Sequence, residues 1–166
     1  EEDGFQYRPE QIRRVLGAGT KAILINSPAN PTGNLLEASR MAEIADTGRW
    51  VLSDEIYHGL VYGDRAHSIL EFTDHCIVFN GFSKLYAMTG FRLGYLIVPM
   101  ELVRPIQKML QNFFISANSV AQAAGCVACG VRTGSSASAA GSVSLSACAP
   151  RLPPTTSSRS GPDRAP

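Results

Sequence analysis

Two apolar runs joined by a short polar connection constrain the fold of this chain more than any other stretch. Residues 76–79 and 91–98 have the composition of short buried strands, and residues 80–90 lie between them. A parallel crossover needs a dozen or more residues, so the sequence predicts an antiparallel pair. Lys84 and Arg92 then fall at the same end of that pair, where two cations repel unless an anion lies between them. A phosphate group would supply that anion.

The residues before this stretch predict alternating helices and strands. Apolar residues at helical spacing mark helices at 9–16 and 35–46, and continuous apolar runs mark strands at 21–27 and 50–54. The run at 21–27 is typical of strands buried on both faces. A short helix is expected around 67–72. This order predicts an α/β fold with a partial, mostly parallel sheet and flanking helices.

The sequence after the sheet divides into a helical part and a part of low complexity. Residues 101–124 carry apolar side chains at helical spacing and predict one long helix, with Phe113 and Phe114 in the core. Residues 125–166 contain nine Ser, seven Ala, five Gly and five Pro, with no aromatic residue and no lysine. Such a composition is a poor basis for a core. We therefore expect one domain at 1–124 and a disordered or frame-shifted tail at 125–166.

Polar residues follow each of the predicted parallel strands. Asn30 comes just after the first strand, Asp54 ends the second, and Lys84 follows the third. Ligands of open parallel sheets bind beyond the carboxyl ends of the strands. The sequence therefore predicts that an amide, a carboxylate and an amine meet at one edge of the sheet.

These groups suit the chemistry of pyridoxal phosphate. A lysine amine forms a Schiff base when a neighbouring cation such as Arg92 favours its neutral form. A carboxylate such as Asp54 can keep a pyridine nitrogen protonated, and Asn30 and Tyr57 can donate to a phenolic oxygen. Each residue also has a simpler interpretation. Lys84 could be a surface amine, Asp54 a helix cap, Asn30 a turn residue and Tyr57 a packing residue.

Three motifs resemble those of the fold type I pyridoxal-phosphate aminotransferases, the class I/II group that includes aspartate aminotransferase. They are NSPANPTG at 26–33, SDEIYHGL at 53–60 and NGFSKLYAMTGFRLGY at 80–95. Together they extend the resemblance over roughly residues 5–124. We interpret the chain as a fragment of the large domain of such an enzyme, because members of this family are more than twice as long.

The resemblance implies a role for each candidate residue. Lys84 would be the catalytic Schiff-base lysine, Asp54 would pair with the pyridine nitrogen, and Arg92 would hold the phosphate. Asn30 and Tyr57 would bind the phenolic oxygen. Gly81 stands where many relatives carry a serine that contacts the phosphate, and Ser83 is the alternative donor.

The implied reaction is transamination between an amino acid and a 2-oxo acid, with Lys84 moving the proton. The alternatives are a lyase or decarboxylase of the same fold, a non-catalytic cofactor-binding regulatory module, or an inert gene fragment. The family also implies a homodimer. The phosphate loop, the stacking ring and the substrate-binding arginine of such enzymes would lie outside this chain, so we expect the chain alone not to be a working transaminase.

Composition limits the remaining possibilities. At 166 residues and net charge +1 the chain can form one core, and its charge does not suggest a nucleic-acid partner. It has no apolar run of membrane-spanning length and no leader at its start, so the default expectation is the cytoplasm. Cys126 and Cys129 have the spacing of a metal pair, but no second pair accompanies them. No metal site is predicted.

Overall fold

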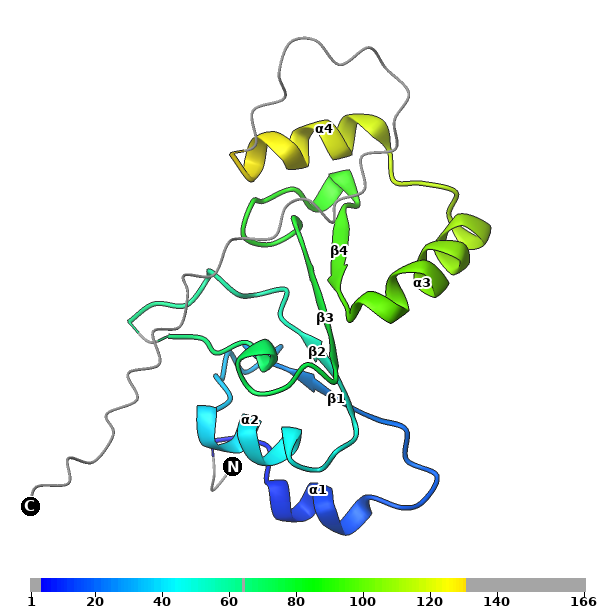
Figure 1. The fold of residues 1–166 in the computed structure, drawn as a ribbon. Helices are drawn as coiled ribbons and strands as arrows, with labels where there is room; N and C mark the ends of the chain where they lie inside the picture. The colour runs from blue at the N-terminus through cyan, green and yellow to red at the C-terminus, as the bar shows by residue number, and fades with distance from the viewer. Residues whose placement is uncertain (1–3, 64, 131–166) are drawn as a thin grey trace, which may run out of the picture. The chain divides into compact units, whose positions relative to one another are not determined.

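The structure is a computed structural model that describes residues 4–63 and 65–130. Its elements follow the predicted alternation of helices and strands (Figure 1). In chain order they are α1 (Pro9–Val15), β1 (Ala22–Asn26), α2 (Ala38–Ala45), β2 (Trp50–Asp54), the 3₁₀ turn η1 (Ile69–Glu71), β3 (Cys76–Gly81), the 3₁₀ turn η2 (Thr89–Phe91), β4 (Gly94–Ile97), α3 (Met100–Phe113) and α4 (Ser119–Ala128). The α/β prediction is confirmed.

The four strands form one mixed sheet in the order β1-β2-β3-β4. The first three strands are parallel, and β4 is antiparallel to β3, as the short connection predicts. Asn26 lies opposite Asp54, and Asp54 lies opposite Phe79. The carboxyl ends of β1, β2 and β3 therefore meet at one edge of the sheet, and the connection from β3 to β4 turns at the same edge.

The core lies on the face of the sheet that α1, α2 and η1 cover (Figure 1). Ile25, Val51 and Val78 point into it from the three parallel strands, and Met41 and Ile44 meet them from α2. All five side chains are at most 1% exposed. Burying a side chain of this size contributes about 1.5–3 kcal/mol, so this layer holds α2 against the sheet.

The opposite face of the sheet is open in the described part of the chain. Leu24 is 67% exposed while its neighbour Ile25 is fully buried, and Phe79 and Leu96 are each 37% exposed. The prediction that the first strand is buried on both faces is therefore wrong here. Adjacent residues of a strand point to opposite faces, and no described helix packs over Leu24.

The second helix is shorter at its start than its apolar spacing predicts. Helix α2 begins at Ala38, not at residue 35, because Leu36 remains part of the preceding loop. The Leu36 backbone N–H donates a hydrogen bond of 3.0 Å to Ser27 Oγ, and Ser27 and Leu36 are both buried. This bond ties the loop after β1 to the start of α2.

The predicted long helix at 101–124 is two helices. Helix α3 ends at Phe113, and Ile115 takes a left-handed conformation with φ of 65°. The side chain of Asn118 then caps α4 by accepting hydrogen bonds from the N–H groups of Val120 and Ala121. Asparagine is a preferred residue at this position, because its side-chain oxygen satisfies N–H groups that have no partner within the helix.

The prediction that Phe113 and Phe114 belong to the core is also wrong. They are 74% and 71% exposed, and no residue of α3 is buried. No described element therefore covers the apolar side of α3.

Helix α4 continues past the composition boundary at Gly125. Gly125 is buried, and a Cβ atom at this position would lie 2.7 Å from Leu93 Cδ2 and 3.3 Å from Phe82 Cζ. The helix thus packs closely on residues that flank the turn between β3 and β4. The boundary falls inside a helix, and residues 131–166, on which the rest of the tail prediction falls, lie outside the described residues.

Residues 4–63 and 65–130 contain no group of three or more His, Cys, Asp or Glu side chains arranged to hold a metal ion. None of the helices in those ranges is both long enough and apolar enough to cross a membrane.

The packing of α4 predicts that a larger side chain at position 125 destabilises the fold. Gly125→Leu should lower the free energy of unfolding by about 1 kcal/mol or more, because overpacking costs about 1–3 kcal/mol and exceeds the gain of up to about 1 kcal/mol from removing a helix glycine. Ala123→Leu, on the exposed side of α4, is the control and should not lower it. Urea unfolding measures both. Equal stability of the two variants would contradict the packing of α4 on Phe82 and Leu93.

Candidate functional site

Asn26 joins two of the loops that meet at the carboxyl edge of the sheet. Its side-chain oxygen accepts a hydrogen bond of 2.8 Å from the Asn30 N–H, and its Nδ2 donates one of 3.1 Å to the Asp54 carbonyl. Its backbone N–H donates to Tyr7 Oη at 3.1 Å. Asn26 thereby fixes the loop after β1 relative to the end of β2.

The loop after β1 places Asn30 against Tyr57. Two cis peptide bonds, Ser27–Pro28 and Asn30–Pro31, shape this loop. The Asn30 Nδ2 donates a hydrogen bond of 3.2 Å to Tyr57 Oη. Two of the residues that the sequence singles out are therefore in direct contact, although 27 residues separate them in the chain.

Lys84 lies over the ring of the same tyrosine. Its Nζ is 5.5 Å from the centroid of the Tyr57 ring, which is within the range of a cation–π contact. The side chain is exposed, and the described residues offer it no carboxylate at ion-pair distance. The amine is therefore restrained by an aromatic ring and remains accessible.

Asp54 occupies the end of β2, between the loops that carry Asn30 and Lys84. Its Oδ1 accepts a hydrogen bond of 3.2 Å from the Ile56 N–H. The residues that follow form a turn and not a helix, so the bond braces a turn and Asp54 is not a helix cap. Its second carboxylate oxygen has no partner among the described residues, so it is available to a hydrogen-bond donor.

Arg92, like Asp54, makes no direct contact with another candidate residue in the described part of the chain. Its backbone takes a left-handed conformation, with φ of 52° and ψ of 45°. Its Nη1 donates a hydrogen bond of 3.1 Å to the Thr89 carbonyl. Gly81 and Gly94 pair at the end of β3 and β4, so Lys84 and Arg92 belong to the same connection. No direct contact joins Arg92 to Asn30, Asp54, Tyr57 or Lys84.

A groove of about 1010 Å³ lies between the loop after β1 and the loop after β2. Asn30 and Tyr57 line it together with Gly33, Leu35 and Tyr62. Asp54, Lys84 and Arg92 are not part of its lining. Asn30 and Tyr57 are thus the two candidate residues that border this groove.

Cys76 is unsuited to act as a nucleophile. Burial raises the pKa of its thiol to about 11, and the nearby carboxylates of Glu55 and Asp74 add to the effect. Only the thiolate reacts readily, so Cys76 stays in its unreactive form at neutral pH. It also begins β3, at the opposite end of the strand from Lys84.

The sequence matches the profile of the aminotransferase class I and II family over residues 1–135. The chain belongs to this family. It is 43% identical over 119 residues to the (5-formylfuran-3-yl)methyl phosphate transaminase of Methanocaldococcus jannaschii, covering 70% of this chain and 32% of that protein. It is 42% identical over 113 residues to the aspartate aminotransferase of Streptomyces avermitilis, covering 63% of this chain and 28% of that protein.

A solved structure shares the fold. The aspartate aminotransferase of Thermotoga maritima superposes with a TM-score of 0.73 at 36% identity, over 76% of this chain and 36% of that one. The chain therefore spans about a third of the length of the relatives it matches. The resemblance inferred from the three motifs is confirmed, and it reaches past residue 124 into the low-complexity segment.

The contacts around position 81 give a physical reason for the glycine there. A Cβ atom on Gly81 would lie 3.0 Å from both Gly94 Cα and the Leu93 carbonyl oxygen. The backbone of Leu93 and Gly94 therefore leaves little room for a side chain at position 81. A phosphate contact from Ser83 stays a prediction.

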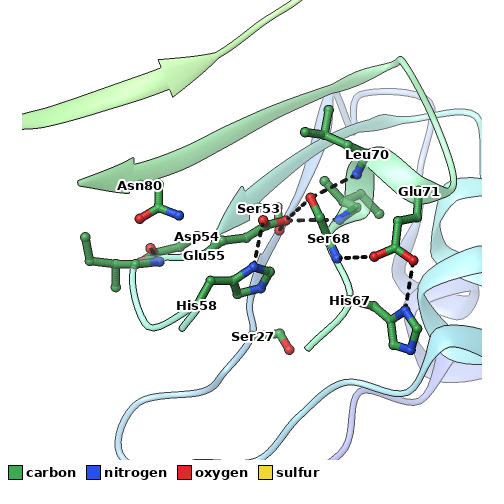
Figure 2. A network of polar contacts seen from close by, with 12 residues as sticks. Ser27, Ser53, Asp54, Glu55, His58, His67, Ser68, Leu70, Glu71 and Asn80 are labelled. Carbon is green, nitrogen blue, oxygen red and sulfur yellow. Dashed lines mark hydrogen bonds and ion pairs between the residues drawn. The ribbon is translucent and has the colours of Figure 1, made fainter. Parts of the chain in front are cut away.

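Two residues of this site were not identified by the sequence analysis. Asn26 appears there only as the first residue of a motif, and Glu55 only as the neighbour of Asp54. Glu55 is 3% exposed and accepts hydrogen bonds from three donors (Figure 2). The sequence offered one signal for each residue. Asn26 is a polar residue at the end of the first strand, and Glu55 continues the buried alternation of the second.

The contacts of Asn26 predict different effects for two similar substitutions. Asn26→Asp should lower the free energy of unfolding by about 1–3 kcal/mol, because it replaces a donor with an oxygen that faces the Asp54 carbonyl. Asn80→Asp is the matched control. Among the described residues, the Asn80 side chain is bonded only through its oxygen, which accepts a hydrogen bond of 2.7 Å from the Gly81 N–H, so this contact survives the change. Urea unfolding measures both, and an equal loss would contradict the role of the Asn26 amide nitrogen.

Proposed function

We propose that this chain holds pyridoxal 5'-phosphate and supplies the catalytic lysine of a transaminase that acts on an amino acid and a 2-oxo acid. The observation that carries the proposal is the convergence of Asn30, Tyr57 and Lys84. Tyr57 contacts Asn30 at 3.2 Å and lies 5.5 Å from the Lys84 amine. All three stand at the sheet edge where Asp54 ends β2.

The donors and acceptors at this edge fit the groups of the cofactor. Tyr57 Oη and Asn30 Nδ2 are donors of the kind a phenolic oxygen needs. The second oxygen of Asp54 can accept from a protonated pyridine nitrogen. Arg92 is a rigid planar cation, and such cations bind phosphate well. The five residues thus include a partner for each polar group of the cofactor.

When bound, pyridoxal phosphate acts as an electron sink for the α-carbon of an amino acid. The residues of the chain hold and orient the reactants and move a proton. We assign to the Nζ of Lys84 the transfer of the proton that leaves the α-carbon. The Tyr57 ring, whose centroid lies 5.5 Å from Nζ, limits where this amine can move.

Asp54 contributes a fixed negative charge. The Ile56 N–H holds one of its oxygens in place, and the backbone of Asp54 is held by Asn26. A carboxylate fixed in this way costs little reorganisation when it stabilises a protonated ring. This arrangement supports the assignment of Asp54 to the pyridine nitrogen.

The family favours transamination over the other reactions that such residues could serve. Lyases and decarboxylases of the same fold would use the same groups, but the relatives named above are transaminases. Those relatives carry the names of different substrates, so we propose the reaction class and no particular amino acid. We further propose a homodimer in the cytoplasm, with no metal, membrane or nucleic-acid partner. The division at residue 124 also remains a proposal.

The test of this function is the site of covalent attachment. Borohydride reduction of the chain in pyridoxal phosphate, followed by peptide mapping, should place the label on Lys84. Lys21 and Lys108 are the internal controls, because they lie outside the sheet edge. A label spread evenly over the three lysines would show that Lys84 is an ordinary surface amine and would overturn the proposal.

A further inference from the structure

Glu55 is a buried carboxylate that the proposed cofactor contacts do not use. It directly follows Asp54, and successive residues of an extended chain point to opposite faces. The inward face of β2 carries Val51 and Ser53, both fully buried, and Glu55 continues this face with 3% exposure. Asp54 points to the other face. The two neighbouring carboxylates therefore have separate surroundings.

One oxygen of Glu55 accepts hydrogen bonds from three donors in two parts of the chain. Its Oε1 accepts hydrogen bonds of 3.0 Å each from Ser53 Oγ, Ser68 Oγ and the Ile69 N–H (Figure 2). Ser53 belongs to β2, whereas Ser68 and Ile69 form the start of η1. Glu55 thereby bonds the end of the strand to the beginning of η1.

The other oxygen of Glu55 holds His58. Its Oε2 lies 3.3 Å from His58 Nδ1. The Glu55 backbone carbonyl also accepts a hydrogen bond of 2.9 Å from the His58 N–H. His58 Nε2 is buried and has no partner among the described residues. The orientation of this ring therefore depends on Glu55. His58 is adjacent to Tyr57, so the hold on His58 also limits the movement of Tyr57.

These contacts enclose the segment that carries Tyr57. The chain leaves the sheet at Asp54 and reaches η1 at Ser68, and Glu55 bonds to both places. Between them Tyr57 makes its contacts with Asn30 and Lys84. We propose that Glu55 is a positioning residue, whose buried carboxylate holds this segment so that Tyr57 stays in reach of Asn30 and Lys84. The inference rests on the proposed cofactor role of Tyr57.

The test variant must keep the shape of the site. Glu55→Ala would leave three buried donors without an acceptor and could unfold the protein. Glu55→Gln keeps one oxygen for those donors and loses the carboxylate that faces His58. Glu43→Gln is the matched control, because Glu43 is an exposed carboxylate paired with Arg13 at 3.3 Å on the far side of the core.

A double-mutant cycle with Tyr57→Phe tests whether Glu55 acts through Tyr57. Glu55→Gln should raise the Kd for pyridoxal phosphate by about 5- to 20-fold, but by less than about 2-fold in the Tyr57→Phe background. Glu43→Gln should leave the Kd unchanged in both. An equal effect of Glu55→Gln in the two backgrounds would overturn the proposal, because a purely structural role would be additive.

Hydrogen exchange tests the same inference without the cofactor. Glu55→Gln should speed the exchange of the peptide covering residues 56–63, in which the N–H groups of His58 and Leu60 are hydrogen-bonded to nearby carbonyls. The peptide covering residues 38–45 should be unaffected. If the wild-type chain binds no pyridoxal phosphate, the proposed function fails while this measurement still decides the role of Glu55. Unchanged exchange of residues 56–63 would overturn it.

Discussion

The parallel pairing of β1, β2 and β3 determines where Asn30, Asp54 and Lys84 lie. Parallel strands bring their carboxyl ends to one edge, and the pairing of Asn26 with Asp54 aligns the first two ends residue by residue. The hydrogen bond from Asn26 Nδ2 to the Asp54 carbonyl strengthens this alignment. If the register slipped by one residue, Asp54 would turn toward the core and Glu55 toward the open face.

The inward face of β2 changes from apolar to polar as it approaches the site. Val51 packs in the core, Ser53 follows it, and Glu55 ends the series at the sheet edge. The same alternation that buries Val51 therefore places Glu55 beneath the Tyr57 segment and leaves Asp54 on the other face. The stability of the core and the geometry of the site depend on one strand, so changes in Ser53 or Glu55 should affect both.

Much of this arrangement could be predicted because its signals are local. The short connection between residues 79 and 91 indicated an antiparallel return, and polar residues at strand ends indicated the edge of the sheet. The break before Asn118 was missed because the apolar spacing runs through it and the cap depends on one residue. Asn26 and Glu55 were missed because their contacts join segments far apart in the chain. The exposure of Leu24 depends on which elements cover the sheet, which spacing alone does not show.

The central claim is that the ends of β1, β2 and β3 serve one cofactor. A crystal structure of the chain grown with pyridoxal phosphate tests it most directly. The account predicts continuous density from Lys84 Nζ to the cofactor, with Asp54 beside the pyridine nitrogen, Asn30 and Tyr57 beside the phenolic oxygen, and Arg92 on the phosphate. Cofactor density attached to Lys21 or Lys108, or a ring that does not contact Asp54, would contradict it.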